Sequence, residues 1–200
     1  MTGWVLIAAC ASPEAPRAGV LWKMEDHAGP AIQARDAVII GDLAAVHAAG
    51  AALEARGPVP GLSREDRAAI AGVQMAGARL SRVNGRADAA GAAAALAEAC
   101  ADCHVARGVA VPLEASGAGH SQPARAMWAA LLSGDGAGWR GGAAALAAAP
   151  MPTDAEPRAW RDLVARVDVA SEADTSATRA AGYASVAIAC QACHAAEEPS

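Results

Sequence analysis

The sequence has no phenylalanine, a single tyrosine and few β-branched residues. Sheets are built largely from aromatic and β-branched side chains, so this composition disfavours a β-rich fold. Alanine dominates the apolar residues, which favours helices that pack closely through small side chains. The composition therefore predicts an all-α protein.

Strong positive charge is also missing. The formal net charge is −5, and no basic run alternates with aromatic residues, so a nucleic-acid partner is not expected. No apolar run approaches the length that crosses a bilayer as a helix. The sequence lacks a phosphate-cradling glycine loop, a nucleophile elbow and the metalloprotease HExxH pattern. It gives no reason to expect an enzyme.

Five cysteines are present, an odd number that excludes complete pairing as disulfides. Four of them lie in two CxxCH motifs, CADCH at 100–104 and CQACH at 190–194. Side chains at i, i+3 and i+4 share one helix face, so each motif can present two thiols and an imidazole to one planar ligand. CxxCH is the attachment signature of c-type haem. The residues expected to hold two haem c groups are Cys100, Cys103, Cys190 and Cys193 through thioether bonds, with His104 and His194 as iron ligands.

Zinc binding and a thioredoxin-like redox pair are the alternatives for these motifs. A zinc ribbon is disfavoured because Cys103 and Cys190 are much farther apart in the sequence than the two cysteine pairs of a zinc ribbon usually are. Thioredoxin-like chemistry expects a βαβ context, which is missing here. Haem is the preferred interpretation, because both copies of the motif include the histidine.

The chain contains an internal repeat. HAGPAIQARDAVIIGD at 27–42 aligns without a gap with HSQPARAMWAALLSGD at 120–135, an offset of 93 residues. SRED at 63–66 aligns with TDAE at 153–156 at an offset of 90 residues, which is also the offset between the two CxxCH motifs. A three-residue deletion between helices reconciles the two values. The sequence is therefore a tandem duplication with one CxxCH motif at the end of each copy.

Each copy is expected to form four helices, and short connections between such helices suit antiparallel bundles. The expected helices of the first copy run from about 27 to 40, from a cap at Asp42, from a capping box at 63–66 to about 82, and through CADCH. Those of the second copy run from about 121 to 132, from Asp135, from a Thr153/Glu156 capping box, and from 174 to 194.

The predicted organisation follows from these helices. Residues 1–20 form a signal remnant, lipobox and tether, 21–108 a first haem-binding four-helix bundle, 109–118 a linker and 119–200 a second haem-binding bundle. Only AAEEPS follows His194 in the sequence, so the fold of each copy is expected to precede its haem motif.

In this arrangement the sequence resembles the cytochrome c′/c556 family, four-helix bundles with CxxCH on the last helix. The resemblance rests on CADCH, CQACH and the first-helix pattern that closes in Gly-Asp. It covers nearly all of residues 20 to 195, as two copies. The prolines at 30 and 123 depart from the pattern unless the first helix of each copy begins close to its histidine.

The resemblance implies that a residue of the first helix lies over the distal face of each haem. Methionine takes this place in c556-like members and a non-ligating apolar residue in c′ members. Methionine does not recur between the copies, whereas His27 and His120 occupy equivalent positions. We expect these two histidines to be the sixth iron ligands. The alternative is that they are exposed polar residues near a helix N-terminus.

The two alternatives for the distal residue predict different functions. A haem with both axial positions filled suits electron transfer, and the expected function is a dihaem c-type cytochrome that works with redox partner proteins. An open position would instead allow nitric oxide, carbon monoxide or peroxide to bind, as in a gas-binding or sensing protein. A haem subunit of a larger respiratory or photosynthetic complex is the third candidate. A homodimer is compatible with the family resemblance.

Haem attachment of this type implies export, so the expected location is the periplasm. IAAC at 7–10 resembles a lipobox, which would make Cys10 a lipidated residue and attach the protein to a membrane through lipid. The alternative is a free thiol in a ragged N-terminus. Nine residues without lysine or arginine make a short signal peptide, which points to a start farther upstream.

Other polar and aromatic residues are assigned structural roles. The five tryptophans and Tyr183 are expected in the core or as chance surface residues rather than as haem contacts. Arg179, upstream of CQACH, could pair a haem propionate, but a solvated surface position is the preferred interpretation.

Overall fold

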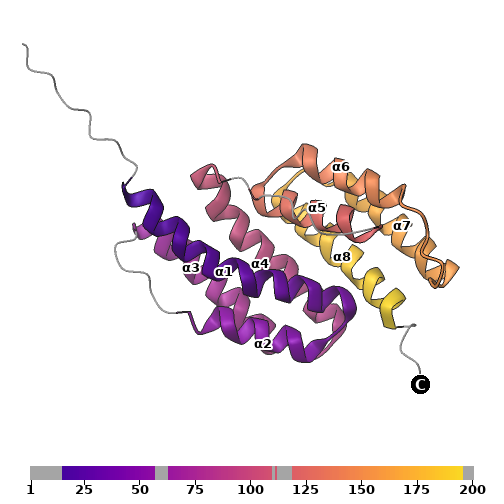
Figure 1. Ribbon diagram of the computed structural model, residues 1–200, viewed down its shortest axis with the longest axis horizontal. Coiled ribbons are helices and arrows are strands. Elements are labelled where there is room, and N and C mark those ends of the chain that lie inside the picture. The colour runs from indigo at the N-terminus through magenta and orange to yellow at the C-terminus, as the bar shows by residue number, and fades with distance from the viewer. Residues whose placement is uncertain (1–14, 57–62, 110, 112–118, 196–200) are drawn as a thin grey trace, which may run out of the picture.

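The computed structural model describes residues 15–56, 63–109, 111 and 119–195. Within these residues the chain forms eight α-helices and no strand, which confirms the all-α prediction (Figure 1). The predicted lipidation site Cys10 and most of the linker lie outside the described residues. The helices are α1 (Ala15–Ile40), α2 (Leu43–Glu54), α3 (Arg64–Leu80), α4 (Arg86–Arg107), α5 (Ser121–Ser133), α6 (Gly136–Ala147), α7 (Pro157–Ser171) and α8 (Ser176–Ala195).

Helix α1 begins earlier than the sequence predicted. It starts at Ala15 and not near His27, so Pro30 lies inside the helix. The residues before His27 include the good helix formers alanine, leucine, lysine, methionine and glutamate, and one proline removes only one backbone donor. In the second copy α5 does begin next to the histidine, and Pro123 lies in its first turn, where proline is tolerated.

The Gly-Asp pairs that close the repeated segment are helix boundaries, as predicted. Gly41 and Gly134 have φ angles of +77° and +67°, the left-handed conformation in which helices commonly end. Asp42 then caps α2 by accepting a hydrogen bond from the backbone of Ala45 at 2.9 Å. Asp135 caps α6 in the same way. Each Gly-Asp pair therefore ends one helix and starts the next.

The third helix differs between the copies. Ser63 caps α3 as predicted, and its hydroxyl accepts a hydrogen bond from the Asp66 backbone at 3.1 Å. The corresponding prediction for the second copy is wrong, because α7 is capped by Glu156 and begins at Pro157 rather than following a cap at Thr153. Proline suits the first helical position, where its missing N–H costs nothing. At the repeat offset of 90 residues, α7 begins three positions later than α3 and ends one position later, so it has 15 residues where α3 has 17.

Within each copy, helices that follow one another in the chain pack together. Further contacts join helices of one copy to helices of the other. Consecutive helices contact one another from α1 to α4 and from α5 to α8, and α1 also contacts α4 while α5 contacts α8. Between the copies α4 packs against α8, α1 against α8 and α4 against α5 (Figure 1). Equivalent helices thus make equivalent contacts, as in a two-fold symmetric dimer. The buried side chains form one cluster that spans both copies.

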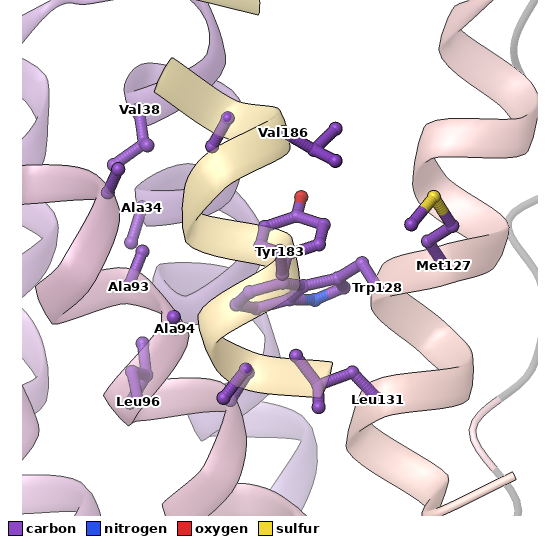
Figure 2. Close-up of a cluster of buried hydrophobic side chains, with 14 of the residues drawn as sticks. Ala34, Val38, Ala93, Ala94, Leu96, Met127, Trp128, Leu131, Tyr183 and Val186 are labelled. Atoms are coloured by element: carbon purple, nitrogen blue, oxygen red, sulfur yellow. The ribbon is translucent and has the colours of Figure 1, made fainter. Parts of the chain in front are cut away.

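Helix α8 stands at the centre of this shared core. Figure 2 shows Trp128 of α5 and Tyr183 of α8 packed together, with Val38 of α1 on the other side of α8. The rings of Trp128 and Tyr183 have centroids 5.1 Å apart, and Trp128 is 1% exposed. On α4, residues such as Ala93 are completely buried, so small side chains let the helices approach closely.

Gly50 of α2 and Gly77 of α3 let these two helices pack closely, and this gives a stability prediction. A Cβ at Gly50 would lie 2.4 Å from the Ser81 nitrogen and 2.7 Å from the Gly77 carbonyl oxygen. Both are backbone atoms that cannot move aside, so Gly50→Ala should lower the free energy of unfolding by about 1–3 kcal/mol. Urea denaturation measures this change.

Gly72→Ala on α3 is the matched control. Its new Cβ would lie 3.8 Å from the nearest atom, and alanine is the better helix former by up to about 1 kcal/mol. We expect its stability to be unchanged or slightly higher. If both variants lost the same stability, close backbone contact at Gly50 would not be the cause.

Candidate functional site

The two CxxCH motifs lie in the last turns of α4 and α8, at the same place in each copy. Helical geometry places the two cysteines and the histidine of each motif on one face. None of the four motif cysteines is joined in a disulfide.

The thiols lie in surroundings that disfavour their charged form. Burial, followed by the neighbouring Cys103, raises the pKa of Cys100 to about 12. Burial, followed by Cys193, likewise raises the pKa of Cys190 to about 12. The pKa of Cys103 is raised first by burial and then by the Asp66 carboxylate. The uncharged thiol is therefore the favoured form of these three cysteines.

In the second copy, the structure brings together two histidines that the sequence singled out by different patterns. His120 lies at the start of α5 and His194 near the end of α8. Their ring centroids are 6.2 Å apart, with the planes at 37° to each other. Trp160 of α7 packs edge-on against His120, with centroids 5.7 Å apart and an interplanar angle of 79°. Three helices of the second copy therefore meet at this pair.

The spacing of the two rings fits a single metal ion between them. Two imidazoles on opposite sides of one metal ion, each with a bond of about 2 Å, have coordinating nitrogens about 4 Å apart and ring centroids about 6 Å apart. The centroids of His120 and His194 are 6.2 Å apart. Among the described residues, no group of three or more His, Cys, Asp or Glu side chains is placed to hold a metal ion by itself. A haem iron, which needs only two axial ligands from protein, fits this donor set.

His104, in the first copy, has a different environment. Its Nδ1 lies 3.1 Å from the carbonyl oxygen of Leu132, near the end of α5 in the second copy. A carbonyl only accepts hydrogen bonds, so Nδ1 carries the proton and Nε2 has the free lone pair. Burial lowers the pKa of His104, which favours the neutral ring. A neutral imidazole with Nε2 available is the form that binds metal.

His27 lies on α1 and is half-buried. The Nδ1 atom of His104 contacts the carbonyl of Leu132, and no observation tests an axial role for His27. His47, which has no histidine counterpart in the second copy, binds the Val83 carbonyl through Nε2 at 2.8 Å. The prediction of an axial ligand at His27 therefore rests on the repeat alone.

A cavity of about 560 Å³ borders His104, a volume within the usual range of ligand pockets. It lies between the end of α4, the second half of α5 and the start of α6. Its α5 wall consists of small side chains, Ala126, Ala129, Ala130 and Ser133.

Arg179 is buried, contrary to the prediction of a solvated position. It is 9% exposed, and its guanidinium donates to the carbonyls of Ala173, Gly134 and Asp174 at 3.4, 3.3 and 2.7 Å. Carbonyls at and beyond helix ends lack intrahelical partners, and Arg179 supplies donors to three of them. Its role is therefore to join α8 to the end of α5 and to the turn that precedes α8.

Two contributors to the site were not predicted from the sequence. Trp160, expected only as a core residue, also contacts His120. The contact of Leu132 with His104 is made by a backbone carbonyl, which carries no residue-specific signal. In both cases the partner lies on another helix, so the pairing depends on how the helices pack.

No family model, no curated protein and no solved structure matches this chain. None of the described helices has the length and apolar character needed to span a bilayer. The geometry around the two CxxCH motifs is therefore the basis for assigning a function.

Proposed function

We propose that this chain is a dihaem c-type cytochrome that carries electrons, built as two tandem four-helix units with one haem c near the end of the last helix of each. The observation that most supports this is the approach of His120 to His194, at a centroid distance of 6.2 Å. The sequence repeat selected the first histidine and the CxxCH motif selected the second. The two histidines come from different helices, so packing brings together two residues that separate sequence patterns had selected.

The roles of the residues follow from their chemistry. Cys100 and Cys103, and in the second copy Cys190 and Cys193, would hold the haem groups by thioether bonds. His104 and His194 would be the proximal ligands, and His27 and His120 the distal ones.

A bound haem supplies one-electron chemistry at iron. The contribution of the chain is to keep its imidazoles in place through helix packing and to surround them with buried side chains. If these histidines held both ligand sites of each iron, no site would be left for a substrate, which favours electron transfer over catalysis.

The proposal includes a location and partners. Covalent haem attachment of this type implies the periplasm. An electron carrier needs redox partner proteins, and the IAAC pattern at 7–10 supports membrane attachment through a lipid on Cys10. Comparing how the chain and its Cys10→Ser variant partition between membranes and the soluble fraction tests the anchor. A homodimer or a place in a larger membrane complex is compatible with this assignment.

Optical and low-temperature EPR spectra of the purified protein, oxidised and reduced, test the function. We expect low-spin signals from both haems and no spectral shift with carbon monoxide, because both axial positions of each iron would be filled. A high-spin component with a carbon monoxide adduct would instead favour the gas-binding alternative. A protein purified without haem after expression with c-type maturation would contradict the assignment altogether.

A further inference from the structure

The Leu132 carbonyl at the end of α5 needs a donor from outside its own helix. The helix terminates at Gly134, whose amide donates to the carbonyls of Ala130 and Leu131, and the Asp135 amide donates to Ala130 at 2.9 Å. The Leu132 carbonyl belongs to the last turn, where carbonyls lack a helical N–H partner. His104 donates to it at 3.1 Å, and Leu132 is itself only 8% exposed.

We propose that the Leu132 carbonyl, in the second copy, is the positioning group for the axial histidine His104 of the first copy. This inference rests on the proposed function. The hydrogen bond fixes which ring nitrogen carries the proton and leaves the Nε2 lone pair available to a metal. It also raises the basicity of Nε2, since a carbonyl that accepts from the other ring nitrogen makes imidazole a stronger donor to metal.

One helix then contributes to both candidate haem sites. His120 precedes α5 and faces His194, whereas Leu132 is twelve residues farther along the chain and faces His104. At a rise of 1.5 Å per residue, the two positions are about 18 Å apart along the helix. Because α5 is a continuous helix between them, it holds the two sites at a constant spacing. The first site is therefore incomplete without the second copy.

Gly134 permits this contact between the copies. A Cβ at Gly134 would lie 2.5 Å from Cγ2 of Val105, the residue that follows His104. Gly134→Ala would therefore strain this contact, because a helical valine is held close to one rotamer and alanine is disfavoured at the Gly134 φ of +67°. Gly41→Ala is the matched control, because Gly41 has a similar positive φ at the end of α1. Its Cβ would meet only the flexible side chain of Arg86, 2.9 Å away.

The test follows the ring N–H of His104 by NMR in the reduced full-length protein, together with the reduction potential of each haem. The Nδ1–H of His104 should exchange slowly with solvent. In Gly134→Ala it should exchange about tenfold faster, as expected for the loss of one hydrogen bond, and the potential of one haem should rise because its axial histidine becomes a weaker donor. Gly41→Ala should leave the exchange of this proton unchanged. A fast-exchanging proton in the parent protein, or equal effects of the two variants, would overturn the inference.

Failure of the proposed function gives a separate result. If the purified chain carries no haem, the function fails, and the same NMR experiment then reads the protonated nitrogen of each neutral ring. His104 should be protonated at Nδ1, with His47, which donates to Val83 from Nε2, as the internal reference. A His104 ring protonated at Nε2 would refute the role of Leu132.

Discussion

Replacing His120 by alanine should open one of the two haems to carbon monoxide. In the parent protein His120 and His194 would fill both axial positions of one iron, as their 6.2 Å centroid spacing suggests. Without His120 that iron becomes five-coordinate, so the reduced protein should bind one carbon monoxide per chain. The oxidised protein should show a high-spin EPR signal from one haem beside the unchanged low-spin signal of the other.

The helix should tolerate this change, because the His120 side chain makes no capping hydrogen bond to α5. His47→Ala is the control, since His47 is bonded to the Val83 carbonyl and has no proposed role at iron. It should leave both haems low-spin and closed to carbon monoxide. If His120→Ala also bound no carbon monoxide, the distal assignment would be wrong and His120 would be a structural residue.

Replacing Cys100 and Cys103 together by alanine should leave one covalent haem per chain in place of two. Each haem would depend on the two thiols of its own CxxCH motif, and the motifs lie on different helices, α4 and α8. The mass of the denatured protein should fall by one haem, and the haem absorbance per chain should be halved.

The complementary variant, with Cys190 and Cys193 replaced by alanine, should give the same stoichiometry but retain the other haem. The two variants together distinguish the spectrum and potential of each site. Retention of two covalent haems in either variant would disprove attachment at that motif. Loss of both haems from one variant would mean that the sites do not load independently, as a shared core would allow.

Local features of the sequence predicted helix boundaries well where one residue type controls the conformation. Gly41 and Gly134 end helices in the left-handed region, and Asp42 and Ser63 cap the helices that follow them. These effects act within a few residues, so a pattern in the sequence is sufficient to find them. The predicted start of α1 near His27 is wrong, because the helix-forming residues before His27 extend the helix to Ala15.

The sequence by itself determined the helical class and the duplication. It also determined that the cysteines and the histidine of each motif share one helix face. All three depend on composition or on spacing along the chain. Tertiary structure alone decided that His120 meets His194, that His104 donates to Leu132 of the other copy and that Arg179 is buried. These outcomes join helices far apart in sequence. They depend on how α4, α5 and α8 pack around one shared core, and no local pattern specifies that packing.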